Sequence, residues 1–252
     1  MYEFEPIIKK NKRKKILNLQ QHSADSKKEL KKATKIKKLK NFLYGNHSNY
    51  YNKGYRDDDP RLSMLNKKYF ENKSVLDVGC HCGAFTLRFS RKFLPLSVHG
   101  VDIDSDLISK ANLALENEKK IYENKKEYPF NVKFSSCDFV ADFKNEENFF
   151  DVVLCLSVTK WVHFNSGDDG IKILFQKIAN FLKKGGILIL EPQKWKTYRK
   201  KLHKVSIKLR PSKFEDYLES IGFKLIEKLV PTNSGNSFAK RNIEIYRFVG
   251  NK

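Results

Sequence analysis

From residue 73 onward, short apolar runs alternate with segments in which apolar residues recur at helical spacing. The apolar runs have strand length and predict buried strands at 73–80, 97–104, 131–136, 149–157 and 187–192. The helically spaced segments predict amphipathic helices at 84–93, 104–117, 169–182 and 212–223. Two further segments, 224–230 and 242–249, predict a late antiparallel strand pair. This alternation predicts an α/β fold with a doubly wound, mostly parallel sheet of seven strands.

Residues 1–40 lack this pattern. They hold 14 lysines and arginines against four acidic residues, and their apolar residues are too sparse to form a core. We expect a basic arm that is disordered or transiently helical, followed by one globular domain over 41–252. The run KKNKRKK at 9–15 suits a nuclear-import signal or a nonspecific RNA tether, and a solvated tail without a specific role is the alternative.

Composition adds a preference for polyanions. The 252 residues carry a formal net charge of +21, which favours nucleic acid or an acidic membrane surface as partner. Part of this charge could instead reflect an AT-rich genome. Cys80 and Cys82 are spaced too closely for a zinc knuckle, so we expect no metal site, and cysteines in a reducing compartment. No apolar run approaches the length of a membrane span.

Ligands of doubly wound sheets bind at the carboxyl ends of the strands. There, Gly79 and Gly83 flank a turn whose middle position is His81, where a pyrophosphate-binding turn needs glycine. Asp102 ends the second strand, where a carboxylate can bind both hydroxyls of a ribose, and Asp138 ends the third, where it can meet an adenine amino group. A glycine turn, a ribose-binding carboxylate and an adenine-binding carboxylate, without a pyrophosphate-binding turn, predict S-adenosylmethionine as cofactor.

The fourth strand ends in CLSVTKWVHFN at 155–165, which places a cation, a large ring and two hydrogen-bonding side chains within six positions. The Asn-Pro-Pro-Tyr signature of amide methylation is absent, and the lysine and carboxylate set that deprotonates a ribose hydroxyl is not evident. A phosphate oxygen needs no general base because it is already ionised. It needs cations, and Lys160 suits this purpose; a surface lysine in a loop is the alternative. We expect Trp161 and His163 to lock a loop rather than to take part in chemistry.

Another segment, 44–62, interleaves aromatic residues with arginines, a composition typical of a site that stacks a base and grips phosphates. It contains Tyr44, Tyr50, Tyr51, Tyr55, Arg56 and Arg61. Packing over the sheet edge is the alternative.

Together, GN-x(3)-YY, VLDVGCHCG, VDID, LSVTKWVHFNSGDDG and GGILILEPQ-x-W resemble the RNA 5′-phosphate methyltransferases of the bicoid-interacting-protein type, the methylphosphate capping enzymes. The resemblance covers residues 42–250 and implies the seven-stranded, Rossmann-like fold of class I methyltransferases. It implies that the cofactor contacts are Tyr51, Arg61, Gly79, Cys80, His81, Asp102, Ile103, Asp138, Phe139 and Leu156. By the same resemblance, Tyr50 stacks on the first base with Phe238 opposite, and Arg56 and Lys160 clamp the triphosphate and serve the catalytic step.

The implied activity is methyl transfer from S-adenosylmethionine, with S-adenosylhomocysteine as product, to the γ-phosphate of a small non-coding RNA. RNAs made by RNA polymerase III, such as U6 small nuclear RNA or telomerase RNA, fit this activity. A nuclear, membrane-free protein, monomeric apart from a ribonucleoprotein that includes a La-related protein, is the expected setting. Two alternatives stay open: an RNA-binding structural subunit with dispensable catalysis, and a methyltransferase acting on the 5′-monophosphate of a transfer RNA.

Overall fold

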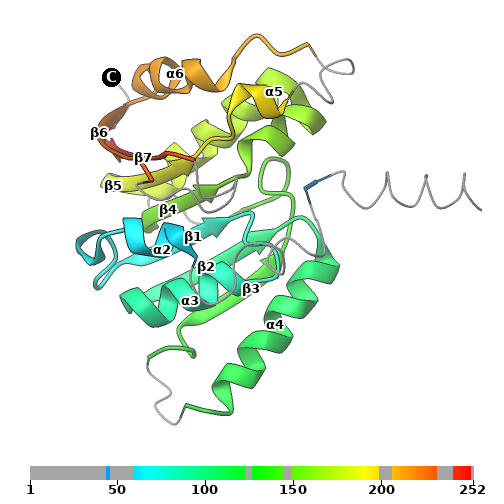
Figure 1. Ribbon diagram of the computed structural model, residues 1–252, viewed down its shortest axis with the longest axis vertical. Helices are drawn as coiled ribbons and strands as arrows, with labels where there is room; N and C mark the ends of the chain where they lie inside the picture. Colours follow the sequence, from blue (N-terminus) through cyan, green and yellow to red (C-terminus); the bar gives the residue numbers. More distant parts are fainter. Residues whose placement is uncertain are drawn as a thin grey trace, which may run out of the picture. The chain divides into compact units, whose positions relative to one another are not determined.

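A seven-stranded mixed sheet forms the centre of the computed structural model (Figure 1), with strand order β3-β2-β1-β4-β5-β7-β6. The structure describes residues 44–45, 59–122, 127–144, 149–198, 206–231 and 241–250. Pairing is parallel from β3 to β5, whereas β7 runs antiparallel to both β5 and β6. The order reverses beside β1, so the ends of β1 and β4 flank the switch point where such sheets bind ligands.

The strands are β1 (Ser74–Val78), β2 (Ser97–Asp102), β3 (Val132–Ser136), β4 (Phe150–Leu156), β5 (Leu182–Glu191), β6 (Phe223–Leu229) and β7 (Ile243–Phe248). The α-helices are α2 (Pro60–Met64), α3 (Ala84–Phe93), α4 (Ser105–Lys119), α5 (Thr159–Phe181) and α6 (Phe214–Ser220). Short 3-10 turns cover Lys67–Tyr69, Trp195–Thr197 and Pro211–Lys213.

Each face of the sheet carries its own hydrophobic cluster, which is why the central strands are apolar on both sides. One face packs against α3 and α4 through residues such as Phe89 and Ala111. The opposite face packs against α5 and α6 through residues such as Phe175 and Phe214. β1 illustrates the alternation, because Val75 belongs to the first cluster and Leu76 to the second. The sheet is therefore doubly wound, as the sequence predicts.

Most predicted elements are confirmed to within a few residues. The helix predicted from 104 is α4, and its N-cap is Asp104, whose side chain accepts from the backbone N–H groups of Asp106 and Leu107. The expected loop after β4 is wrong. α5 begins at Thr159 directly after the strand and is interrupted only at Gly167, whose φ of 63° and ψ of −159° are non-helical. The predicted start at 169 is thus the second half of a broken helix, and the motif KWVHFN lies in the first half. Thr159 and His163, one turn apart, face inward and are fully buried, which explains the helical conformation.

None of the helices in the described residues is long and apolar enough to cross a membrane. Over the same residues, no three histidine, cysteine or acidic side chains cluster in a way that could hold a metal ion.

Candidate functional site

The glycine turn after β1 lies at the carboxyl edge of the sheet, in a backbone conformation set by close packing. Gly79 and Gly83 have φ values of 75° and 71°, which favour glycine. A Cβ on Gly79 would lie 2.4 Å from Val158 Cγ2, and one on Gly83 would lie 2.7 Å from Phe134 Cζ. The N–H groups of Gly79 and Cys80 donate to the Val101 carbonyl, which fixes the turn against β2. Neither glycine therefore has room for a side chain.

Asp102, at the end of β2, is bound to this turn. Its carboxylate accepts from the backbone N–H of His81 at 2.8 Å and from that of Asp104 at 3.0 Å. Burial raises the pKa of Asp102, and the backbone N–H donors oppose this shift. His81 itself has a φ of 55°, an uncommon conformation for a residue with a side chain. The hydrogen bond to Asp102 stabilises that conformation and orients the carboxylate.

The other predicted cofactor contacts on this side lie close to Asp102. Ile103 follows it directly and is half-buried. The β2–β3 register pairs Asp102 with Ser136, so Asp138 leaves the neighbouring strand at the same edge. One oxygen of Asp138, Oδ1, accepts from the N–H groups of Val140 and Ala141 at 2.9 and 3.2 Å. The Phe139 ring packs in the hydrophobic cluster below α5, so only its backbone would be available to a ligand at the edge.

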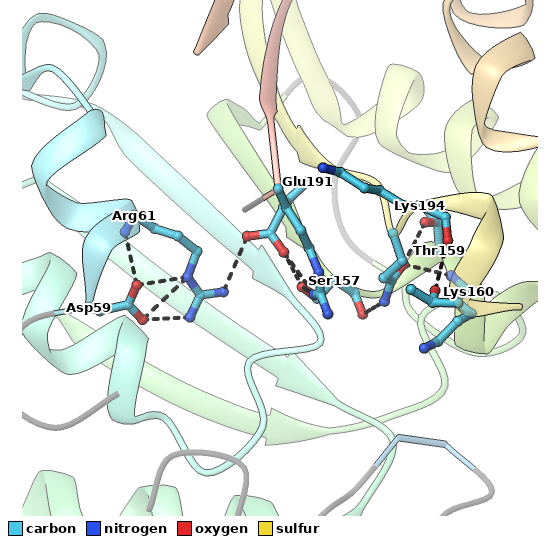
Figure 2. A network of polar contacts seen from close by, with 10 residues as sticks. Asp59, Arg61, Ser157, Thr159, Lys160, Glu191 and Lys194 are labelled. Carbon is cyan, nitrogen blue, oxygen red and sulfur yellow. Dashed lines mark hydrogen bonds and ion pairs between the residues drawn. The ribbon is translucent and has the colours of Figure 1, made fainter. Parts of the chain in front are cut away.

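A buried polar network joins the ends of β4 and β5 (Figure 2). Leu156 is buried at the end of β4, and the next residue, Ser157, has a φ of 65°. The Ser157 hydroxyl donates to Glu191 and accepts from the Arg241 guanidinium. Arg241 Nη1 also lies 3.1 Å from Glu191 Oε1. Glu191 is only 1% exposed, so its charge requires these partners.

Arg61 extends this network toward α2 (Figure 2). Its Nη2 lies 2.6 Å from Asp59 Oδ2, its Nη1 lies 3.9 Å from Glu191 Oε2, and its guanidinium carbon lies 4.5 Å from the centre of the Phe85 ring. The negative charges of Asp59 and Glu191 are thus compensated by the guanidinium groups of Arg61 and Arg241 within one cluster. The cofactor role of Arg61 stays a prediction, because here its charge is neutralised by acids of the chain itself.

Gln193 links this network to the start of α5. It is 1% exposed, and its Oε1 accepts from the Lys160 backbone N–H at 3.0 Å and from the Thr159 hydroxyl at 3.1 Å. Its Nε2 donates to the Ser157 carbonyl. The N-cap residue, Val158, makes no side-chain capping bond, so Gln193, in the segment after β5, supplies the acceptor that a helix start needs.

Lys160 lies in the first turn of α5 and is half-buried. Its Nζ lies 4.9 Å from the centre of the Trp161 ring. A Cβ on Gly45 would lie 2.3 Å from the same ring, so the start of the segment 44–62 packs against Trp161 of the KWVHFN motif.

His163 holds the first half of α5 in place. Its Nδ1 lies 3.2 Å from the Tyr198 hydroxyl, and its Nε2 lies 3.5 Å from Asp168 Oδ1. Burial lowers the pKa of His163 to about 4, so the ring is neutral at physiological pH. It is a structural tie within a helix, whereas the sequence led us to expect such a tie within a loop.

Four predicted site residues, Tyr50, Tyr51, Arg56 and Phe238, lie outside the described residues. Conversely, sequence reasoning assigned no role to Gln193, Glu191 or Arg241. The motif EPQ-x-W, which contains the first two, was the available signal, but only the structure shows that β5 delivers them to the start of α5.

The amino-acid sequence is similar to known RNA methyltransferases. The family model described as bicoid-interacting protein 3 matches residues 150–248, and a general methyltransferase domain matches 75–186. A probable RNA methyltransferase of Arabidopsis thaliana is 36% identical over 78% of this chain and 77% of its own length. The U6 snRNA methylphosphate capping enzyme Amus of Drosophila melanogaster is 37% identical over 82% of this chain and 75% of its own length. The chain belongs to the bicoid-interacting protein 3 family.

Other family relatives are less completely covered. The human 7SK snRNA methylphosphate capping enzyme is 32% identical over 81% of this chain but only 39% of its own length. A pre-miRNA 5′-monophosphate methyltransferase of Xenopus laevis is 29% identical over 62% of this chain. Among solved structures, the N-methyltransferase NodS of Bradyrhizobium japonicum WM9, in complex with S-adenosyl-L-homocysteine, superposes with a TM-score of 0.61 at 16% identity, over 84% of this chain and 97% of that one. This likeness shows the fold, that of class I methyltransferases.

As a member of this family, the chain is an S-adenosylmethionine-dependent methyltransferase, and the residues of the carboxyl edge fit that cofactor. The turn 79–83 contains no lysine or arginine that could bind a phosphate, and the oriented Asp102 carboxylate suits a ribose diol. S-adenosylmethionine supplies the methyl group, whereas Gly79, Gly83 and Asp102 would hold and orient it.

Proposed function

We propose that this chain methylates the γ-phosphate at the 5′ end of a small non-coding RNA. The observation that carries the proposal is the position of Lys160, held by Gln193 in the first turn of α5 at the carboxyl end of β4. The positive end of the helix dipole and a lysine side chain coincide there, and both favour an anionic group. Because a phosphate oxygen is already ionised, this site needs to align and neutralise it but not to deprotonate it.

At the carboxyl edge of the sheet, the proposed cofactor site and the proposed phosphate site lie at the ends of different strands. Asp102 and the glycine turn hold the cofactor beside β1 and β2, and Lys160 attracts the phosphates beside β4. Arg56 is proposed as the second clamp and Tyr50 as the ring beneath the first base, with Phe238 opposite. The names of the human and Drosophila relatives, which are methylphosphate capping enzymes of 7SK and U6 snRNA, support a nuclear small RNA made by RNA polymerase III as substrate. Retention of the capped RNA in a ribonucleoprotein with a La-related protein belongs to the same proposal.

A second candidate is methylation of a 5′-monophosphate, which the name of the Xenopus relative favours. A comparison of one RNA sequence with a 5′-triphosphate, diphosphate, monophosphate or hydroxyl end separates the two. With labelled S-adenosylmethionine, we expect transfer to the triphosphate form and the lowest KM for it. Preferred transfer to the monophosphate would establish the second candidate, and equal transfer to the hydroxyl form would exclude both.

A further inference from the structure

A cationic surface continues from the start of α5 along two segments that follow β5. It consists of Lys194 and Lys196 around the 3-10 turn Trp195–Thr197, together with Lys208 and Arg210. All four cations are exposed, and none of them forms an ion pair with an acidic residue of the described chain. We name these four residues and Trp195 the 194–210 surface.

Two fixed contacts hold the 194–210 surface together. The guanidinium carbon of Arg210 lies 4.9 Å from the centre of the Trp195 ring, and that ring lies 5.0 Å from the ring of Tyr198. Tyr198 is fully buried against His163 of α5. The two segments are therefore neighbours and rest on the helix that carries Lys160.

Asp168 fixes the second segment through its backbone. Its Oδ2 accepts from the N–H groups of Lys208 and Leu209 at 2.9 and 3.0 Å. Leu209 packs into the cluster beneath α5, whereas the side chains of Lys208 and Arg210 remain in solvent. The Asp168 carboxylate and the packed Leu209 side chain therefore hold this segment so that Lys208 and Arg210 face the solvent.

The surface begins next to the proposed phosphate site. The Gln193 side chain accepts a hydrogen bond from the Lys160 backbone N–H. Lys194 is the next residue after Gln193, and the Cα atoms of Gln193 and Lys194 are about 4 Å apart. Figure 2 labels both Lys160 and Lys194, whose side chains point in different directions from neighbouring stretches of backbone. An RNA whose 5′ end lies at Lys160 therefore starts close to the 194–210 surface.

We propose that the 194–210 surface binds the sugar–phosphate backbone of the RNA downstream of its 5′ end. Unpaired cations grouped around a partly buried aromatic ring are the composition of a surface that tracks nucleic acid. Arginine stacked on a ring keeps its donors in a fixed plane, which suits phosphate oxygens. An acidic protein is the competing occupant, but it would need no continuity with Lys160. The proposal rests on the proposed function and extends it from the 5′ end to the body of the RNA.

The test uses the full chain and the triple variant Lys196→Gln/Lys208→Gln/Arg210→Gln. Lys194 is left intact because it lies beside Lys160. The matched control is Lys73→Gln/Lys120→Gln/Lys184→Gln, which removes three exposed lysines. Lys73 precedes β1 and Lys184 lies near the start of β5, at the edge of the sheet opposite the site. Substrates are a 5′-triphosphate trinucleotide and a long hairpin RNA with the same 5′ end.

For the hairpin, we expect the triple variant to raise KM about tenfold and to lower the slope of log affinity against log salt by about two to three, one for each lost phosphate contact. Transfer to the trinucleotide and the slope of the control should match the wild type. An unchanged KM and slope with the hairpin would overturn the proposal, as would an equal loss with both substrates. Weakened binding of an acidic polypeptide, with RNA binding intact, would assign the surface to a protein and overturn it as well.

Failure of the proposed function would be seen separately. If the wild type transfers a methyl group to neither substrate, that function fails. Fluorescence anisotropy with a hairpin bearing a 5′-hydroxyl still measures how tightly the protein binds RNA without a 5′-phosphate. An unchanged affinity of the triple variant for this hairpin would contradict the inference on its own.

Discussion

Gln193, two residues after β5, accepts a hydrogen bond from the backbone N–H of Lys160, 3.0 Å away, at the start of α5. The same side chain binds Thr159 and Ser157, so one buried amide fixes the turn on which the proposed phosphate contact is placed. The position of Lys160 therefore depends on a residue 33 positions away.

The first prediction is that Gln193→Met weakens binding of 5′-triphosphate RNA about tenfold, because it leaves buried backbone groups without partners at the start of α5. Affinity for S-adenosylhomocysteine should change little. The decisive measurement is a double-mutant cycle on RNA affinity: once Lys160→Ala is present, Gln193→Met should cause little further loss. Additive losses would show that Gln193 only stabilises the fold. Gln176→Met, on an exposed site of α5, is the control.

The second prediction concerns the glycine turn. Gly79→Ala combines a left-handed backbone with a Cβ 2.4 Å from Val158 Cγ2, whereas Gly185→Ala has a φ of 84° but nothing within 4 Å. We expect Gly185→Ala to lower the free energy of unfolding by about 1 kcal/mol and Gly79→Ala by at least about 2 kcal/mol more. Urea titration of both variants measures this difference. Equal losses would mean that the packing of Val158 against the turn is loose.

The third prediction is that Asp102→Ala weakens S-adenosylhomocysteine binding about 10- to 100-fold, the effect of a lost charge-assisted hydrogen bond. Asp106→Ala, at an exposed position of α4, should bind like the wild type in isothermal titration calorimetry. Because burial raises the pKa of Asp102, wild-type affinity should fall on acidification at a higher pH than an ordinary carboxylate would cause. Unchanged affinity of Asp102→Ala would remove the ribose role.

The fourth prediction uses Asp77, which is 3% exposed at the end of β1. Burial raises its pKa to about 6, although the Thr86 hydroxyl and Arg61 oppose the shift. The folded state therefore keeps a proton that the unfolded state releases, and this contribution to stability is lost as pH rises from about 4 to about 6. Asp77→Asn should be more stable than the wild type at about pH 7.5, by up to about 3 kcal/mol, and equally stable near about pH 3.5.

The difference between the two proteins is the quantity to measure, because His163 titrates with the opposite sign over the same range. Its lowered pKa, about 4, makes the wild type lose stability on acidification, and that loss is common to both proteins. A difference in unfolding free energy that does not vary with pH would contradict the assignment to Asp77.

The sequence predicted the sheet well because its strands are apolar on both faces and its helices have capped, periodic patterns. Asp104, which caps α4, is an example of such local information. The broken helix α5 escaped prediction because Thr159 and His163 are polar residues on its buried face, and their partners Gln193 and Tyr198 are distant in the sequence. Glu191 and Arg241 were missed for the same reason. Their contacts with each other and with Ser157 form only because β4, β5 and β7 are neighbours in the folded sheet.

The central claim is that Lys160 brings the terminal phosphate of an RNA to the methyl donor. Its most direct test is mass spectrometry of the 5′-terminal nucleotide after incubation of a 5′-triphosphate RNA and S-adenosylmethionine with the wild type or with Lys160→Ala. The wild type should add one methyl group to the γ-phosphate and protect that end from phosphatase. Lys160→Ala should add none while still binding S-adenosylhomocysteine. A methyl group on a base or ribose, or undiminished γ-phosphate methylation by Lys160→Ala, would contradict the claim.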